Sequence, residues 1–199
     1  MSVSEAPSLA AAQAAGFPLA GEDLAIDLAN TLITSTDPPT DLLDDPVRVR
    51  TFWKLQADRL PLDAPVPSPI ATRRLRAAVR ELLEAQIGGR EPAATALEDV
   101  TAAAAAAPVS ERAVLIEGRL VRRTRWHAEH PQDLALAVVA RAVIALVTDP
   151  ERCARMRECA NPSCSMLFEA VNTRRVWCTA NICGNRARVS RHYARRRSE

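Results

Sequence analysis

The sequence predicts a mainly α-helical protein with one small β-hairpin, in which a helical N-terminal domain precedes a C-terminal four-cysteine lobe that ends in a basic helix. Three observations predict this fold class. Apolar residues recur at helical spacing through most of the chain, a single stretch alternates like a hairpin, and all five cysteines lie within residues 151–199. With 199 residues, 48% of them hydrophobic and 25% charged, the chain can bury a core. We expect a flexible arm over residues 1–16, a helical domain over residues 17–150 and the cysteine lobe over residues 151–199.

The first helix is expected in the segment GEDLAIDLANTL, which begins at Gly21. Leu24, Leu28 and Leu32 recur every four residues, and acidic residues stand at the start of the segment, where the helix dipole favours them. Alternation of apolar residues from Leu24 also leaves open a short strand that enters a helix.

Three more helices are expected before residue 108. Asp45 is an N-cap followed by proline, which predicts a helix that carries Phe52 and Trp53. After a stiff proline-rich connector over residues 61–69, the clearest apolar stripe of the chain runs from residue 75 to 87, and two glycines end it. The arginines at positions 73, 74, 76 and 80 lie largely off this stripe, so we expect a solvated polar face there. Residues 92–107, with six consecutive alanines, predict the third helix.

The pattern then changes from helix to hairpin and back. Residues 113–116 and 119–122 flank Glu117-Gly118 and predict two paired strands. Residues 133–147 are apolar nearly all round, which predicts the central buried helix. The longest apolar run, residues 134–147, is too short to cross a bilayer and contains Arg141. Asp149 and the proline after it begin a last body helix, which is expected to run toward Cys159.

The formal net charge of +2 hides two halves of opposite sign. Residues 151–199 hold eleven arginines and four glutamates, a net charge of +7, so residues 1–150 carry −5. A basic segment of this size indicates a polyanionic partner, most often nucleic acid. Because the acidic body would be repelled by DNA, we expect DNA contacts to be confined to the lobe.

Four of the cysteines form a symmetrical frame, C-x4-C-x13-C-x4-C, made of Cys159, Cys164, Cys178 and Cys183. Two close pairs at this separation are typical of a tetrahedral zinc site, because each pair delivers two thiolates from a tight turn. Four thiolates leave no open coordination position, which indicates one structural zinc ion rather than a catalytic metal. Clustered cysteines and a start that lacks the pattern of a signal peptide favour a reducing cytoplasm.

Other uses of these residues fit less well. The spacings do not match the usual ferredoxin runs, and the C-x-x-C pair of redox thiols is absent. Cys153, inside the last body helix, is expected to be a buried spare thiol. His192 lies nine residues beyond Cys183 on a helix, where it is poorly placed to replace a ligand.

The residues after Cys183 predict a helix with one basic side. Arg188, Arg191 and Arg195 recur at i, i+3 and i+7 as a ridge, whereas Val189 and Tyr193 project to the other side and are expected to pack on the zinc core. Such a ridge can contact guanine edges or phosphates of duplex DNA. Additional contacts are expected from Arg174 and Arg175, at phosphates; Arg186 falls on the side of Val189. The alternatives are a solvated surface or a face that docks on the acidic body.

The function classes can be ordered from these features. A zinc lobe with a basic helix favours DNA binding, with an RNA-binding zinc module or a protein-docking adaptor as the alternative. An enzyme is not expected, because H-E-x-x-H, Walker and G-x-S-x-G motifs are absent. A DNA-binding protein of this kind would be cytoplasmic, and nucleoid-associated when bound; whether it forms a homodimer is left open.

The lobe resembles the CGNR zinc finger family in four stretches, which are CANPSC from Cys159, LF at 167–168, RRVWC ending at Cys178 and CGNRAR from Cys183. The GEDLAIDLANTL segment and Trp53 are similar to the ABATE domain that is usually joined to this finger. The resemblance implies a bacterial, stress-induced transcription regulator in which the four cysteines bind zinc, the finger binds DNA with Asn185 and Arg186 in its motif, and the N-terminal domain senses a ligand. The family often has an aspartate after the LF pair, where this chain has Glu169.

Four body residues are candidates for contacts to a small-molecule effector. Asp27, Asn30 and Thr31 are polar residues on a largely apolar segment, and Trp53 is a candidate wall of a pocket. We favour the alternative that Asp27 and Asn30 satisfy backbone groups or cap a turn inside the core. If a pocket is present, an effector would act by favouring one presentation of the basic lobe.

Overall fold

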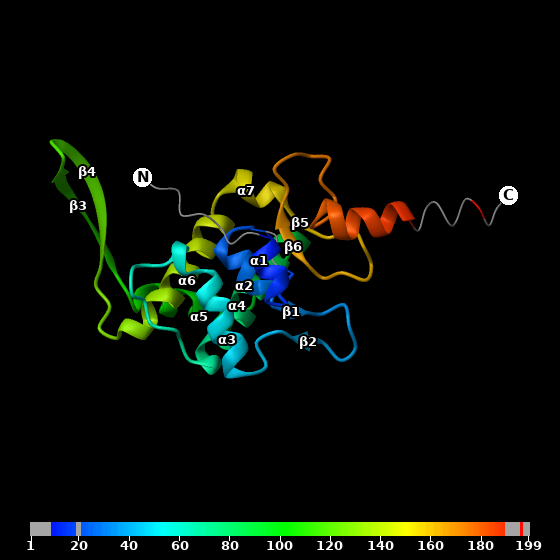
Figure 1. Ribbon diagram of the computed structural model, residues 1–199, viewed down its shortest axis with the longest axis horizontal. Helices are drawn as coiled ribbons and strands as arrows, with labels where there is room; N and C mark the ends of the chain where they lie inside the picture. Colours follow the sequence, from blue (N-terminus) through cyan, green and yellow to red (C-terminus); the bar gives the residue numbers. More distant parts are fainter. Residues whose placement is uncertain (1–8, 19–20, 190–195, 197–199) are drawn as a thin grey trace.

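A computed structural model describes residues 9–18, 21–189 and 196 of the chain. A bundle of helices forms the body, with the cysteine lobe at one end of its long axis and a β-hairpin at the other (Figure 1). The fold class expected from the sequence is confirmed, since helices dominate and the strands form three antiparallel pairs among the described residues.

The body contains the following elements in chain order: α1 (Leu9–Ala14), α2 (Leu24–Ala29), β1 (Leu32–Ile33), β2 (Thr40–Asp41), α3 (Pro46–Leu55), the 3₁₀ helix η1 (Ala57–Arg59), α4 (Pro69–Gly88), α5 (Ala94–Ala105), β3 (Val109–Ile116), β4 (Arg119–Trp126), the 3₁₀ helix η2 (Pro131–Asp133) and α6 (Leu134–Val147). The lobe contains α7 (Pro150–Arg155), β5 (Met156–Glu158), β6 (Leu167–Glu169) and the π-helical turn η3 (Ala180–Gly184), after which residues 185–189 are α-helical. Among the described residues, no helix is both long and apolar enough to span a membrane.

Local sequence signals determine where these helices begin and end. The carboxylates of Asp23 and Asp45 accept hydrogen bonds from the first backbone N–H groups of α2 and α3, and Ser68 does the same for α4. α4 ends at Gly89, whose φ of 63° is the left-handed conformation that glycine adopts without strain. The predicted boundaries of α3 to α6 are therefore correct to within a few residues.

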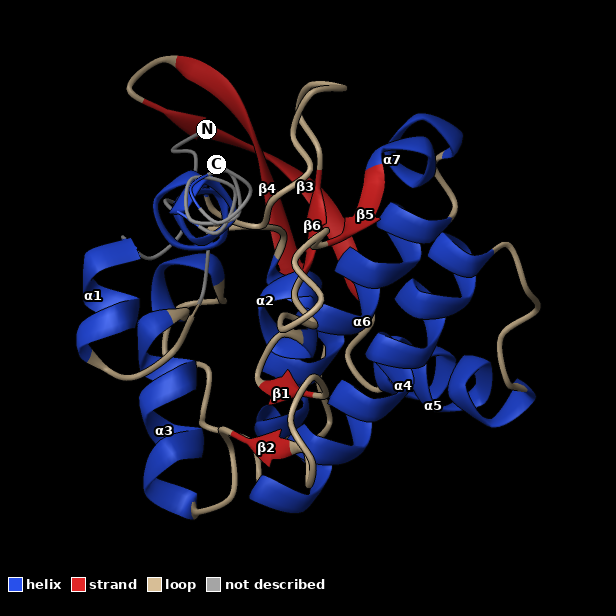
Figure 2. Cartoon of the chain, turned by 90° about the vertical axis from the view of Figure 1, so that its right-hand side faces the viewer, coloured by secondary structure: helices blue, strands red, loops and turns tan. Residues whose placement is uncertain are grey.

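The hydrophobic core runs without interruption from the body into the lobe. α2, α4 and α6 supply most of it, with fully buried residues such as Ile26, Leu83 and Val143. Met156 of β5 and Leu167 of β6 belong to the same cluster, since β5 lies against α4 and β6 against α2 (Figure 2). A second, smaller cluster surrounds the cysteines. The lobe is thus anchored in the body by its own apolar side chains.

The structure corrects three expectations about the elements. Residues 9–14 of the expected arm form α1, whose Ala12 is buried in the core. α7 ends at Arg155, because the chain then extends as β5 and pairs with β6 instead of continuing as a helix to Cys159. Of the α4 arginines expected on a solvated face, Arg76 and Arg80 are each only 5% exposed. Arg76 pairs with Asp41, and Arg80 donates hydrogen bonds to backbone carbonyl groups inside the fold.

Candidate metal centre and its seam with the body

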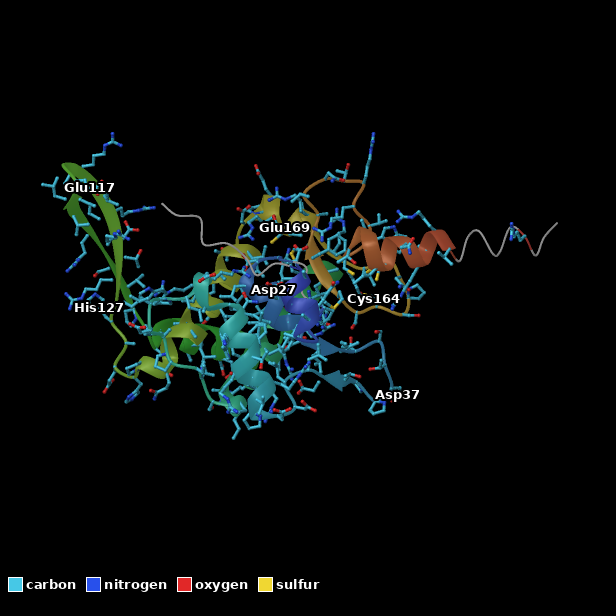
Figure 3. All side chains as sticks on the ribbon, viewed as in Figure 1. Asp27, Asp37, Glu117, His127, Cys164 and Glu169 are labelled. Atoms are coloured by element: carbon cyan, nitrogen blue, oxygen red, sulfur yellow. The ribbon has the colours of Figure 1, made fainter. Side chains whose placement is uncertain are left out.

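The four cysteines of the frame come together from four different local structures. Cys159 follows β5, and Cys164 ends a turn in which its N–H bonds to the carbonyl of Asn161. Cys178 precedes η3 and Cys183 lies within it. The sulfur atoms gather in the lobe around Cys164, far from Glu117 at the hairpin tip (Figure 3). The two predicted pairs therefore converge on one point.

The spacing of the sulfur atoms fits one tetrahedral ion. All four Sγ atoms lie within 4.8 Å of one another. The Sγ of Cys178 is 3.8 Å from that of Cys164 and 3.6 Å from that of Cys183. Zn–S bonds of about 2.3 Å place the sulfurs of a regular tetrahedron about 3.8 Å apart. The four cysteines are therefore positioned to hold one structural zinc ion.

The electrostatics of the centre also favour a bound cation. The hydrogen bond from Cys178 lowers the pKa of the Cys164 thiol to about 5, whereas the hydrogen bond to Cys164 and burial raise the pKa of Cys178. Without a metal ion, one ionised sulfur thus opposes ionisation of its neighbour. A divalent cation removes this conflict, because it stabilises all four thiolates together.

Hydrogen bonds to the sulfur atoms orient the centre. The backbone N–H of Cys178 donates to the Sγ of Cys159 at 3.4 Å, and the side-chain amide of Asn161 donates to the Sγ of Cys183 at 3.6 Å. Arg175 supports the same loop from outside, because its guanidinium lies 4.5 Å over the ring of Phe168 and donates to the carbonyl of Cys178. These donors support a set of thiolates rather than neutral thiols.

The lobe is joined to the body along what we call the seam, and Asn30 is at its centre. The amide of Asn30 donates to the carbonyl of Leu167 at 2.9 Å and accepts from the N–H of Leu167 at 2.8 Å. One side chain thus acts like a partner strand on the free edge of β6, which would otherwise leave two buried backbone groups unpaired. The favoured alternative for Asn30, satisfaction of backbone groups in the core, is confirmed; the groups belong to the lobe.

Ion pairs extend the seam on one side of Asn30. Glu22 accepts the N–H of Glu169 at 3.1 Å and pairs with Arg175. Arg152 bridges Asp23 and Glu169, at 2.9 Å from each carboxylate. Acidic residues before α2 therefore neutralise arginines of the lobe. The guanidinium of Arg175 is therefore paired within the protein, and its expected contact to phosphates stays a prediction that would require it to leave Glu22.

Arg80 extends the seam on the other side. Its guanidinium donates to the carbonyls of Ala29 and Leu32 in the body and to the carbonyl of Ser165 in the lobe, at 3.3, 2.9 and 3.2 Å. The hydroxyl of Ser165 in turn accepts the N–H of Thr34 at 2.8 Å. Arg80 thus donates hydrogen bonds to backbone carbonyl groups of both parts at the point where the chain leaves α2. No local pattern in α4 distinguishes it from Arg74, which is exposed and pairs with Asp99.

Asp27 is fully buried inside the body. Its Oδ2 accepts from Arg59 at 2.8 Å and from Gln56 at 3.3 Å, while its buried Oδ1 has no hydrogen-bond partner. Arg59 also donates to the carbonyl of Glu22 at 2.8 Å. Burial raises the pKa of Asp27 from 3.8 to about 7, even though Arg59 acts in the opposite direction. Asp27 therefore supports the loop that carries Glu22.

The raised pKa of Asp27 predicts a pH-dependent contribution to stability. The unfolded chain releases this proton near pH 3.8 and the folded chain near pH 7, so folding takes up a proton between these values. We expect the stability of the wild type relative to Asp27→Asn to be highest below about pH 4 and to fall by a few kcal/mol as the pH rises to about 7. Urea unfolding of both proteins between pH 4 and 8 measures this difference, and a difference that grew with pH would contradict the assignment.

The other two effector candidates are also buried. Thr31 donates to the carbonyl of Leu28 at 2.7 Å, and the indole N–H of Trp53 donates to Thr72 at 3.1 Å. Trp53 does border a surface hollow of about 700 Å³ between α3 and the proline-rich connector, together with Arg50 and Lys54. Of the four candidates, only Trp53 contributes to this hollow, and the other three side chains are occupied by protein groups.

The residues expected to contact DNA separate into three groups. Arg174, Asn185, Arg186 and Arg188 are exposed on the lobe, whereas Arg175 belongs to the seam. Arg191 and Arg195, like Tyr193 and His192, lie outside the described residues. Val189 is 45% exposed, so the expectation that it packs on the zinc core is wrong. Asn185, Arg186 and Val189 instead line an open hollow of about 400 Å³ with Asn161 and Ser163.

Two family descriptions match the chain, in the order of its two parts. The ABATE family, described as "Putative stress-induced transcription regulator", matches residues 22–150. The CGNR zinc finger matches residues 155–196 and so includes the four cysteines and the exposed arginines. No curated protein matches the sequence. The structure agrees with these matches, because the GEDLAIDLANT segment of the helical body contacts the four-cysteine lobe through Asn30. The chain therefore belongs to the ABATE family and carries a CGNR zinc finger after its ABATE domain.

Proposed function

We propose that this protein is a transcription regulator that binds duplex DNA through the exposed face of its zinc lobe. The observation that carries the proposal is the division of the lobe's arginines. Arg152, Arg155 and Arg175 are neutralised by carboxylates, whereas Arg174 and Arg186 have no ion pair among the described residues. Unpaired guanidinium groups on a rigid, metal-braced surface are suited to phosphates and guanine edges.

The zinc ion in this proposal is structural. Cys183 lies at the base of the helix that continues through residues 185–189, so the ion fixes the direction in which Asn185, Arg186 and Arg188 point. The hollow beside Asn185 and Arg186 offers a concave surface next to these cations. Neither matching family is described as an enzyme, and in our proposal the protein regulates transcription in the cytoplasm without catalysis.

The body would present the lobe and respond to an effector. The hollow beside Trp53 is bordered by Ala57 and Asp58 of η1, and Arg59 of the same turn holds both Asp27 and the carbonyl of Glu22. Glu22 reaches the lobe through Arg175. An effector in the hollow would thus act on the seam through η1. An effector whose influence on DNA affinity is unchanged by Arg59→Gln would rule out this route.

The test compares two variants that lose equal charge. We expect Arg174→Gln/Arg186→Gln/Arg188→Gln to weaken binding to a duplex and to reduce the slope of log K against log salt by up to about 3, since each lost phosphate contact contributes about 0.9. Fluorescence anisotropy between 50 and 300 mM salt measures both quantities. The control, Arg50→Gln/Arg74→Gln/Arg90→Gln, removes three exposed body arginines.

Two results would contradict the proposal. Equal affinity and slope in the two variants would place the interface elsewhere. Tighter binding to structured RNA than to a matched duplex at about 200 mM salt would favour the RNA-binding alternative, because the nonspecific phosphate contribution is weak at that salt concentration.

A further inference from the structure

The hairpin β3–β4 is the most exposed regular element among the described residues. Its strands pair over eight positions, from Val109 opposite Trp126 to Ile116 opposite Arg119, so it extends about 25 Å from the body (Figure 1). None of its strand residues is buried. Because an isolated two-stranded hairpin is at best marginally stable in water, a hairpin uncovered on both faces suggests a partner.

The base of the hairpin is fixed, so its direction is determined by the body. The hydroxyl of Ser110 bonds to Nε2 of His127 at 2.6 Å, and the N–H of His127 donates to the carbonyl of Pro108 at 2.8 Å. Trp126 lies 5.9 Å from the guanidinium of Arg141 on α6. The tip is closed by Glu117 and Gly118, which both have positive φ, as a tight two-residue turn requires.

The strand register separates the charges of the hairpin onto two faces. Directly paired residues share a face, and faces alternate along each strand. One face, which we call the basic face, carries Arg112, Arg119, Arg123 and Arg125 with no carboxylate among its strand residues. The opposite face carries Glu111, which pairs with Arg122 at 3.4 Å.

The arginines of the basic face have no partner within the described part of the protein. No hydrogen bond or ion pair engages the guanidinium groups of Arg112, Arg119, Arg123 or Arg125. Arg112 and Arg123 are directly opposite each other, and like charges in that position destabilise a strand pair. A bound anion would reduce the repulsion between these two guanidinium groups. The arrangement is therefore suited to binding a polyanion.

The charge of the hairpin contrasts with its surroundings. Residues 109–126 contain five arginines and two glutamates, a net charge of +3, so the remainder of residues 1–150 carries −8. The tip also exposes Leu115 and Leu120, at 70% and 77%, which by the register lie on the face opposite the basic face. A two-stranded ribbon fits the major groove of DNA, and apolar side chains at such tips can pack against base edges or steps.

From this geometry we propose that β3–β4 is a second contact to duplex DNA, in which the basic face binds phosphates and the apolar tip reaches into a groove. This inference rests on the proposed function and extends it. It also replaces the expectation that DNA contacts are confined to the lobe, because the acidic body projects its own basic element. The lobe and the hairpin lie at opposite ends of the molecule, so the bound duplex would be held at two separated places (Figure 1).

The test uses the full zinc-loaded chain and the triple variant Arg112→Gln/Arg123→Gln/Arg125→Gln. We expect its affinity for a 40-base-pair duplex to fall at least about tenfold and its salt slope to decrease by about 2 to 3 relative to the control Arg50→Gln/Arg74→Gln/Arg90→Gln. The substitutions remove a repulsive pair and no buried contact, so circular dichroism is expected to show unchanged folding. Hydrogen exchange of residues 109–126 is expected to slow when the duplex binds the wild type.

The outcomes separate this inference from the proposed function. A hairpin variant with the slope of the control, and no protection of residues 109–126, would overturn the inference even if the lobe variant loses binding. Loss in the hairpin variant alone would support the inference and move the main interface away from the lobe. The hairpin could instead bind a second copy of the chain. In that case the wild type would sediment as a dimer, whereas the hairpin variant would be a monomer with an unchanged salt slope. This result would also overturn the inference.

Discussion

Replacing Cys178 by serine is expected to abolish zinc retention and to unfold the lobe while lowering the stability of the body. Structural zinc contributes about 10–16 kcal/mol of binding free energy in small zinc domains. This is as large as, or larger than, the free energy of unfolding of most single domains. From the sequence alone, loss of the metal would unfold residues 151–199 and leave the body helical. The structure adds a cost to the body, because Met156 and Leu167 are part of its core.

The size of that added cost can be estimated from the core positions that would be vacated. Removing two buried side chains of this size costs about 4 kcal/mol or more. We therefore expect Cys178→Ser to keep most of its helical circular dichroism at low temperature and to unfold at markedly lower urea concentration. A metal-sensitive dye measures zinc content on the same samples.

Cys153→Ser is the matched control. The thiol of Cys153 lies outside the cluster and contacts the carbonyls of Leu146 and Val147, so this variant is expected to retain one zinc per chain and nearly wild-type stability. If Cys178→Ser also retained a full equivalent of zinc, the ligand assignment would be wrong. If it lost zinc without any change in the stability of the body, the shared core would not couple the two parts.

Asn30→Ala is expected to cost about 2–5 kcal/mol, because it leaves the buried N–H and carbonyl of Leu167 without partners. The cost is unusual for a single neutral side chain, and it arises because one amide satisfies both groups. Urea unfolding gives the free energy, and hydrogen exchange at residues 165–170 is expected to accelerate, since the free edge of β6 would become accessible.

Two further variants sharpen this prediction. Asn185→Ala makes the same change at an exposed position and is expected to cost less than about 0.5 kcal/mol. Asn30→Asp keeps an acceptor for the N–H of Leu167 but loses the donor to its carbonyl and places a charge in the core, so it is expected to be at least as destabilising as Asn30→Ala. A cost for Asn30→Ala equal to that of Asn185→Ala would mean that the seam does not depend on this amide.

Much of the metal centre could be predicted from the sequence because its information is local. The C-x4-C pairs each lie within one turn, and their spacing alone restricts the geometry to a shared ion. The caps at Asp45 and Gly89 and the turn at Glu117 act within a few residues, which is why α3, α4 and the hairpin were predictable. α7 was predicted too long, because pairing of β5 with β6 outweighed the local preference for helix.

The uses of the polar side chains could not be predicted in the same way. Asn30 and Leu167 are 137 residues apart, and Glu22 and Arg175 are 153 apart. In the sequence, Arg175 resembles Arg174, and Arg80 resembles Arg74. One signal was available, namely the cluster of acids before α2, which complements the basic lobe.

By itself, the sequence determined that the chain has a helical body, a four-cysteine metal centre and an excess of arginine near its end. Only the tertiary structure decided which of the described arginines are neutralised by carboxylates and which have no ion pair within the described part of the chain. The physical reason is that a charge is bound by whatever the fold places within a few ångströms, and that neighbourhood is set by packing between distant segments. The same packing gave three candidate effector residues partners inside the protein and left the hairpin's basic face without a partner among the residues that the structure describes.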